Sequence, residues 1–192
     1  LSCVAEIGVR YAVIGHISQI SMVKEFSLIP RGDFGIGVQN SLTIGELKRL
    51  GIESCTVSFE NRMEQIRDLS KDIPVEMIIY GRLPLMIMEN CIIKNRGNGC
   101  TCDKIPSMLK DRKGEAFPVE RAWGCRNEVF NAKVLWLADK SEDWTKAGVR
   151  YGRLNFVREE VQECLDVAER YMNNSGKLPN EFTRGLYYRG VE

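Results

Sequence analysis

The sequence predicts an α/β protein that contains part of a (β/α)8 barrel with parallel strands. Near-continuous apolar segments alternate with segments of helical spacing, at intervals of about 20 residues. The hydrophobic content of 44% in 192 residues is enough for a sizeable core. A doubly wound open sheet is the alternative, but no Gly-rich phosphate loop opens a helix, because Gly35-Ile36-Gly37 lies inside a predicted strand. The barrel is therefore favoured.

Each element follows from local signals along the chain. Asn40-Ser41 is a helix cap, Gly51 stops the helix that it opens, and Asn61 is the expected cap of the next helix. Gly32-Asp33 is expected to form a turn. The predicted strands are 10–15, 34–38, 54–58, 75–80, 134–138 and 152–156. The predicted helices are 1–8 (the end of a helix), 17–26, 42–50, 61–69, 141–147 and 158–171. The tail 173–192 is expected to pack across the outside.

We expect residues 1–192 to form a single domain, and this domain to be a fragment. The chain begins at Leu1 without a methionine, and the first two units of a barrel are missing from the pattern. The remaining units would come from the parent chain or from a partner. Open parallel edges invite pairing, so we expect the chain either to form a homodimer or to leave its barrel open. Residues 91–125 form a cysteine-rich insertion with the composition of a loop.

Composition excludes several classes of protein. The 27 Lys and Arg nearly balance 26 Asp and Glu, so the overall charge does not indicate nucleic-acid binding. The longest apolar run, 75–93, is interrupted by Gly81 and Pro84 and carries Glu76 and Glu89, which argues against a membrane span. Seven cysteines, three of them in apolar or helical surroundings, favour a reducing compartment. We therefore expect a cytoplasmic protein that does not enter a membrane.

Four cysteines within the insertion predict a metal centre: Cys91, Cys100, Cys102 and Cys125. The glycines before Cys100 allow a tight backbone, and Cys125 follows a turn-rich segment. Four thiolates that converge from irregular segments suit a soft metal. Both a [4Fe-4S] cluster and zinc fit, because spacing alone does not separate them.

Polar side chains follow several predicted strands, at the edge where barrels carry their chemistry. Glu60 and Arg82 are candidate catalytic residues, and Arg82 has the geometry to bind a small carboxylate or a phosphate. Asn40 is a candidate substrate-binding residue. The alternative for each is a cap or an ion pair at a strand end. Glu76 lies inside an apolar strand, so it is either paired in the barrel lumen or part of an edge strand.

His16 is the only histidine, and it follows the strand 10–15. A Ser-His or Cys-His protease would need it as the base, so it is a third candidate catalytic residue. The alternative is a hydrogen-bonded, half-buried side chain. Metalloprotease motifs such as His-Glu-x-x-His are absent from the sequence.

A basic segment adjoins the cysteines. Arg112 and Arg126 are candidate contacts to an RNA backbone, although charged loop residues are more often simply solvated. Trp123 could stack on a base, but we expect it to be buried over the metal.

A series of motifs runs through the chain in order. It comprises Gly32-Asp33, Asn40-Ser41, Thr56-Val57-Ser58-Phe59-Glu60, Tyr80-Gly81-Arg82-Leu83-Pro84-Leu85-Met86, Glu89-Asn90-Cys91, Leu109-Lys110-Asp111-Arg112-Lys113-Gly114, Phe117-Pro118-Val119, Cys125-Arg126-Asn127, Asn131 and Phe182-Thr183-Arg184-Gly185-Leu186-Tyr187-Tyr188-Arg189-Gly190-Val191. This series resembles the collagenase-like peptidase family of unassigned catalytic type (peptidase family U, number 32), over essentially the whole chain.

The resemblance implies two kinds of activity. Some members of the family are described as collagen-degrading proteases. Others are oxygen-independent hydroxylation proteins that hold a [4Fe-4S] cluster on four cysteines and act on tRNA, ribosomal RNA or ubiquinone precursors, some with prephenate as the hydroxyl source. Cys91, Cys100, Cys102 and Cys125 match that cysteine pattern, except that Cys100-Thr101-Cys102 is closer than the middle pair of many relatives.

The favoured function is therefore an iron–sulfur-dependent enzyme of the hydroxylation or RNA-modification type. A protease is the first alternative. A non-catalytic binding module stabilised by metal is the second.

Overall fold

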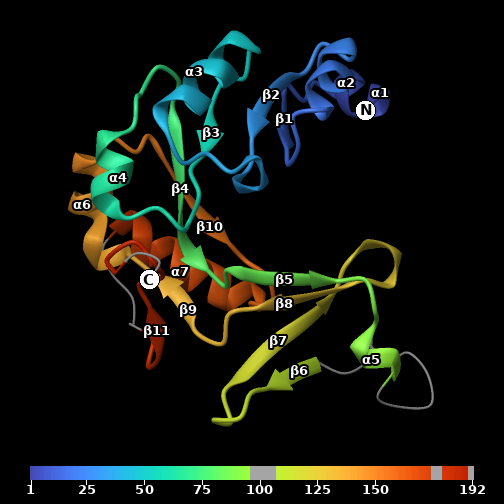
Figure 1. Cartoon of the computed structure of the whole chain (residues 1–192), viewed down its shortest axis with the longest axis vertical. Coiled ribbons are helices and arrows are strands. Elements are labelled where there is room, and N and C mark those ends of the chain that lie inside the picture. Colours follow the sequence, from blue (N-terminus) through green and yellow to red (C-terminus); the bar gives the residue numbers. More distant parts are fainter. Residues whose placement is uncertain (96–106, 174–178, 190–192) are drawn as a thin grey trace. The chain divides into compact units, whose positions relative to one another are not determined.

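A computed structural model describes residues 1–95, 107–173 and 179–189 (Figure 1). The chain divides into two compact units. The first contains Leu1–Ile79, Leu137–Leu154 and Arg184–Glu192. The second contains Tyr80–Trp136 and Asn155–Thr183. Among the described helices, none combines the length and the apolarity that crossing a lipid bilayer would require.

The first unit is built on a parallel sheet. Strands β1 (Tyr11–Ile14), β2 (Ile29–Gly32), β3 (Cys55–Thr56) and β4 (Val75–Gly81) pair in chain order, each parallel to the next. β10 (Tyr151–Asn155) also pairs with β4. Among the described strands, β1 pairs only with β2, so its other side is an edge. The structure is therefore a mixed α/β fold with parallel neighbours, as predicted.

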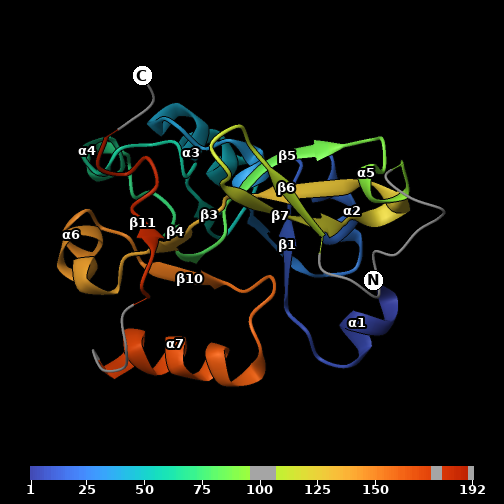
Figure 2. The same cartoon turned by 90° about the horizontal axis from the view of Figure 1, so that it is seen from below.

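The helices of this unit begin and end largely where the sequence signals lie. They are α1 (Ser2–Glu6), α2 (Gln19–Glu25), α3 (Ser41–Arg49), α4 (Met63–Asp68) and α6 (Ser141–Lys146), with the 3-10 turn η3 (Ala138–Lys140) before α6. Asn40 caps α3 by accepting a hydrogen bond from the Thr43 N–H at 2.9 Å, and Gly51 follows it with φ +77°. α4 and α6 lie side by side (Figures 1 and 2).

The prediction that Asn61 caps α4 is wrong. Arg62 is the capping position, and its N–H donates to Gln65 Oε1. The Asn61 side chain is buried instead, where its Nδ2 donates to the Val38 carbonyl at 3.1 Å. A buried amide needs such a partner, and this bond fixes the connection after β3.

The core of the first unit lies against β4. Val75, Met77 and Ile78 are fully buried, as is Ile66 on α4. Tyr187 is also fully buried and donates its hydroxyl hydrogen to the Ile78 carbonyl at 3.0 Å. The tail was expected on the outside, but Tyr187 is part of the core.

The predicted strand 34–38 is wrong, and β2 lies just before it. Phe34–Ile36 forms a 3-10 turn, η1, which Asp33 caps by accepting from the Phe34 N–H. Gly37 ends the turn at φ +72°, and Val38 forms only an isolated bridge with Val57. The alternation of small and apolar residues suited a strand, but Asp33 bonds the backbone locally and favours a turn.

The second unit contains an antiparallel sheet. Its strand order is β5 (Pro84–Met88), β8 (Asn127–Phe130), β7 (Ala116–Arg121) and β6 (Ser107–Lys110). A small buried cluster consists of Val119 on β7, Val129 on β8 and Ile93. Residues 91–125 were expected to be a loop region, and this expectation is wrong for β6 and β7. They form a hairpin whose turn is fixed by Asp111, which accepts from the Lys113 and Glu115 N–H groups, and by Gly114 at φ +86°.

Three further elements complete the second unit. β9 (Val134–Trp136) runs antiparallel to the end of β4, with Tyr80 opposite Trp136. β11 (Phe182–Thr183) pairs in parallel with β9. The amphipathic helix α7 (Val161–Asn173) is confirmed, although it starts three residues later than predicted. The aromatic rings of Tyr80, Trp136 and Tyr171 pack together, with centroids 5.4 to 6.3 Å apart.

Candidate functional site

Cys91 and Cys125 lie at the same end of the antiparallel sheet. Cys91 follows β5 by three residues, and Cys125 precedes β8 by two. β5 and β8 are antiparallel, and Met88, the last residue of β5, pairs with Asn127, the first residue of β8. Adjacent ends of two paired strands therefore carry the first and last of the four candidate ligands (Figure 1).

The side chain of Asn127 connects the segment that follows Cys91 with the segment that follows Cys125. Its side chain is completely buried. Its Oδ1 accepts from the Ile92 N–H at 2.7 Å, and its Nδ2 donates to the Arg126 carbonyl at 3.1 Å. One side-chain amide thus bonds both to Ile92, which follows Cys91, and to Arg126, which follows Cys125. The sequence alone gives no indication of this role for Asn127.

Cys100 and Cys102 lie outside the described residues. The described residues on either side of them belong to this end of the sheet. On one side is the short helix α5 (Ile92–Asn95), which directly follows Cys91. On the other is Ser107, which opens β6 and pairs with Val119, two residues before the partner of Asn127. Ser107 therefore lies at the same end of the antiparallel sheet as Cys91 and Cys125.

The donor set suits a soft metal. Cys91 is half-buried, and its Sγ accepts from the Lys94 N–H at 3.4 Å, the kind of bond that stabilises a ligating sulfur. Cys125 is exposed and has φ +65°, one of two non-glycine residues at positive φ in the described chain. Such conformations cost free energy and cluster at functional sites. Among the described residues, which omit two of the four cysteines, no three potential ligands gather into a metal site.

The remaining three cysteines lie outside the insertion, on α1, β3 and α7. Cys55 is buried in β3, and burial raises the pKa of its thiol to about 12, so the thiolate that binds metals is scarce. Cys3 is exposed on α1 and Cys164 is half-buried on α7. These three serve as natural controls for any test of the four candidates.

Trp123 is 86% exposed, so its expected burial over the metal is wrong. It opens the 3-10 turn η2 (Trp123–Cys125), whose backbone carries the ring outward. The guanidinium carbon of Arg126 lies 6.0 Å from the centre of the indole, and Arg126 Nε also pairs with Glu89 at 2.7 Å. Arg112 lies in the exposed turn of the β6–β7 hairpin. An exposed tryptophan beside an arginine is a surface on which a base can stack.

Three of the candidate catalytic or substrate-binding residues lie in the first unit, and each bonds to residues close to it in the sequence. His16 is exposed after β1, where its Nδ1 lies 2.8 Å from Ser18 Oγ and accepts from the Ser18 N–H at 3.2 Å. Glu60 is exposed after β3, and its N–H donates to Ser58 Oγ. Asn40 serves as the cap of α3. Arg82 belongs to the second unit, so its convergence with Glu60 and His16 stays a prediction.

Glu76 has its partner within the sheet. Its Oε1 accepts from the Thr56 hydroxyl at 2.8 Å and pairs with Arg153 Nη2. Arg153 Nη1 also pairs with Asp33 at 2.5 Å. The four side chains come from β3, β4, β10 and the residue after β2, and the three charged ones are 22–25% exposed. The alternative of a paired Glu76 is the observed one, whereas the roles of Asp33 and Arg153 were missed.

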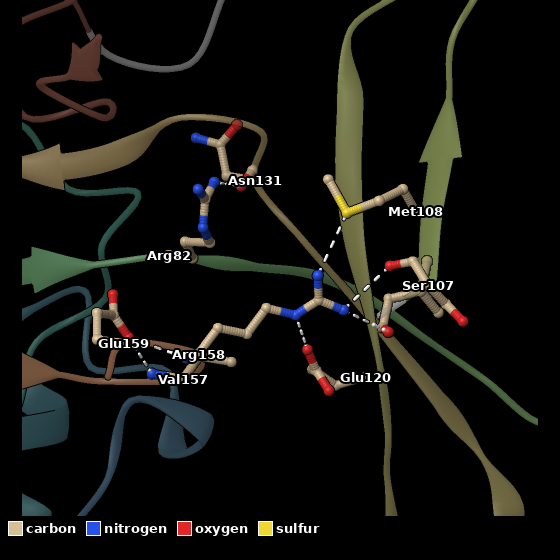
Figure 3. Close-up of polar contacts among 9 residues, drawn as sticks. Arg82, Ser107, Met108, Glu120, Asn131, Val157, Arg158 and Glu159 are labelled. Atoms are coloured by element: carbon tan, nitrogen blue, oxygen red, sulfur yellow. Dashed lines mark hydrogen bonds and ion pairs between the residues drawn. The ribbon is translucent and has the colours of Figure 1, made fainter. Parts of the chain in front are cut away.

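Arg82 is anchored by the backbone (Figure 3). Its Nη1 donates to the carbonyls of Asn131 and Ala132. Among the described residues, nothing accepts from its Nε or Nη2, which form the edge that binds carboxylates side-on. The sequence placed Arg82 at a strand end but gave no indication of this anchor.

Arg158 is engaged on all its nitrogens in the same region (Figure 3). Nε pairs with Glu120, Nη2 donates to the Ser107 and Val119 carbonyls, and Nη1 contacts Met108 Sδ at 3.3 Å. Its neighbour Glu159 accepts from the Tyr80 hydroxyl at 3.0 Å and from the Val157 N–H at 2.7 Å. Burial, followed by the charge of Glu159, raises the pKa of the Tyr80 phenol above its ordinary value.

These residues surround a cavity of about 560 Å³ that lies within the second unit. Its wall combines aromatic, apolar and charged side chains, with carboxylates on or just before α7 and Arg82 at the junction of β4 and β5. The lining residues are Tyr80, Arg82, Met108, Pro118, Val134, Trp136, Arg158, Glu159, Glu163, Asp166, Val167, Pro179 and Asn180. Apolar walls with a few placed polar groups are typical of small-molecule sites.

Comparison of the chain with models of protein families, with curated proteins and with solved structures found no match.

Proposed function

We propose that Cys91, Cys100, Cys102 and Cys125 hold a [4Fe-4S] cluster in an enzyme of the oxygen-independent hydroxylation or RNA-modification type, related to the collagenase-like peptidase family. The observation that carries the proposal is the fastening of the Cys91 and Cys125 segments by the buried Asn127. The bond between the Asn127 side chain and the Ile92 N–H holds the Cys91 segment beside the Cys125 segment, an orientation that the ligands of one metal centre need.

A bound cluster would supply single-electron transfer, or an exchangeable iron to which a substrate oxygen binds. The surrounding residues would bind the substrate. Trp123 offers an exposed ring two residues from Cys125, and Arg126 lies beside it. A base that stacks on Trp123, with its phosphate on Arg126, would lie next to the metal ligands, whereas Arg112 lies in the turn at the other end of the β6–β7 hairpin. This favours RNA over a peptide as the substrate class.

We also propose that the sheet of the first unit is part of a (β/α)8 barrel. Strands β1 to β4 are parallel neighbours in chain order, as in a barrel, whereas a doubly wound sheet changes direction within its strand order. The free edge of β1, where Tyr11 and Val13 are 38% and 59% exposed, would pair with further barrel units or with a second copy of the chain. Solution scattering that shows a compact, closed monomer would contradict this.

Anaerobic purification with iron and sulfide analysis tests the metal, and the affinity of the purified variants for RNA tests the substrate class. The wild-type chain is expected to be brown, with about four irons and four sulfides per chain. Cys91→Ser should lose most of the iron, while Cys164→Ser should keep it because Cys164 lies on α7. Trp123→Ala should keep the iron but bind single-stranded RNA about tenfold more weakly, since a stacked base contributes about 1–3 kcal/mol.

Two results would redirect the proposal. A colourless protein with stoichiometric zinc would make the centre structural and would favour a binding module. Cleavage of denatured collagen or casein that survives Cys91→Ser but not His16→Ala would favour a protease, with His16 as the base.

A further inference from the structure

Arg82 carries a positive charge that no carboxylate of the described chain neutralises through a salt bridge. Its side chain is half-buried, and its Nη1 donates to the carbonyls of Asn131 and Ala132 (Figure 3). Backbone carbonyls fix the position of a guanidinium but bring no negative charge. Charged groups that leave water are usually paired, so this arrangement favours an anion as the partner of Arg82.

The carbonyl bonds of Arg82 use only Nη1. Within the described chain, nothing accepts from its Nε or Nη2, and Arg82 lines the cavity of the second unit. Nε and Nη2 carry two parallel N–H groups, which match the two oxygens of one carboxylate. A carboxylate on this edge would therefore accept two charge-assisted hydrogen bonds from a side chain that is already held in place.

The other arginine in the described wall of the cavity, Arg158, already has its partners. Its Nε pairs with Glu120, and its Nη2 donates to two carbonyls of the β6–β7 hairpin. The described wall therefore offers a ligand one arginine edge, that of Arg82. A second carboxylate on the same ligand would lose its hydration without gaining an equivalent donor, which weakens binding.

The carboxylates of the cavity wall are hydrogen-bonded within the chain or solvated. Glu159 accepts from the Tyr80 hydroxyl at 3.0 Å and from the backbone N–H groups of residues 157 and 158. Glu163 and Asp166 are exposed on α7, and each accepts one hydrogen bond from a residue close to it in the sequence. Solvent and salt screen exposed charges, so these two weaken the attraction of Arg82 for an anion less than buried carboxylates would.

The rest of the cavity wall is largely apolar. Tyr80 precedes Arg82 by two residues and lies opposite Trp136 in the pairing of β4 with β9, with their rings 5.7 Å apart. The remaining apolar lining residues are Met108, Pro118, Val134 and Val167. An apolar group attached to the carboxylate would leave water against these side chains, which favours binding.

We propose that this cavity binds a monocarboxylate with an aromatic or branched aliphatic body. The two carboxylate oxygens accept from Nε and Nη2 of Arg82, and the body lies against the apolar wall. The cavity volume of about 560 Å³ leaves room for several waters beside such a molecule. Arg82 precedes β5 and Cys91 follows it, so this site and the cysteine centre lie at opposite ends of that strand, and binding does not require a metal.

Three ligands with the same ring test the proposal on the purified full chain by isothermal titration calorimetry. At mildly alkaline pH, 3-phenylpropionate carries one charge, 3-phenylpropionamide carries none, and benzylmalonate carries a second carboxylate. 3-Phenylpropionate is expected to bind at least about tenfold more tightly than either of the others, because only its carboxylate is both present and fully paired. Equal or tighter binding of the amide or of benzylmalonate, or no binding of any of the three, would overturn the proposal.

Arg82→Gln tests the carboxylate end of the ligand. This variant should bind 3-phenylpropionate no more tightly than the amide, while Arg49→Gln, on the surface of α3, should keep the preference for the acid. Because Arg82 also bonds to two carbonyls, circular dichroism checks that the variant is folded. A folded Arg82→Gln protein that still prefers the acid would refute the proposal.

Val134→Phe tests the apolar wall and removes no hydrogen bond. Val134 is partly exposed at the start of β9 and lines the cavity, so the larger ring should fill part of the volume and weaken the binding of 3-phenylpropionate at least about tenfold. Val161→Phe is the control, because Val161 is 76% exposed on α7 and is not among the lining residues. Unchanged affinity in Val134→Phe would show that the ligand lies elsewhere.

Discussion

Gly81→Ala is expected to lose about 4 kcal/mol or more of folding free energy, enough to unfold much of the protein. A Cβ at this position would overlap with the carbonyl oxygen of Asn155 and would lie 2.9 Å from its carbonyl carbon. The neighbour is backbone, so no rotation of a side chain relieves the overlap. Gly81 also has φ +121°, a region that alanine rarely adopts.

Urea unfolding followed by circular dichroism measures this loss, and Gly45→Ala is the matched control. Gly45 lies in the middle of α3, and a Cβ added there would have no neighbouring atom within 4 Å. At this position alanine should stabilise the protein by about 0.5–1 kcal/mol through helix propensity. A Gly81→Ala midpoint close to that of the wild type would show that β4 and Asn155 do not approach as closely as the structure has them.

Arg153→Met is expected to destabilise the protein by about 2–4 kcal/mol. The change leaves the carboxylates of Asp33 and Glu76 near one another without the cation that each contacts. Loss of one partner from a fully buried pair costs about 3–5 kcal/mol, and the partial exposure of these side chains reduces that figure. The Thr56 hydroxyl also loses the hydrogen bond donated by Arg153 Nη2 at 3.1 Å.

The control for this variant is Arg49→Met. Arg49 pairs with Glu46 on the surface of α3, where the two side chains are 70% and 52% exposed, so its loss should cost less than about 0.5 kcal/mol. Adding Glu76→Gln to Arg153→Met should restore part of the lost stability, because it removes one of the two opposed carboxylates. Equal, small losses in Arg153→Met and Arg49→Met would show that the charged cluster is well solvated.

Local sequence signals predicted the elements that depend on local chemistry. The Asn40 cap, the Gly51 stop and the apolar run of β4 each act within a few residues, and each is observed. β2 was missed because Ile29-Pro30-Arg31-Gly32 has neither alternation nor continuous apolarity. It holds its place through β1 and through Arg31, whose guanidinium lies 3.9 Å from the centre of the Tyr11 ring.

The site residues also divide into those that local sequence reveals and those that depend on contacts between distant parts of the chain. The four cysteines are recognisable because thiols cluster in the sequence, but the role of Asn127 requires knowledge of which strand lies beside Cys91. Arg153 could not be assigned, since Asp33 is 120 residues away. The hairpin of β6 and β7 could have been found, because Met108-Leu109 and Phe117 to Val119 flank a turn that ends in Lys113-Gly114.

Tyr187 has a consequence for synthesis on the ribosome. Its hydroxyl bonds to Ile78, 109 residues earlier, and its carbonyl accepts from the Met63 N–H at 2.8 Å. The amino-terminal strands therefore leave the ribosomal tunnel long before the side chain that completes their core has been translated. During that interval their apolar surface is uncovered, so the nascent chain is expected to need a chaperone until Tyr187 emerges.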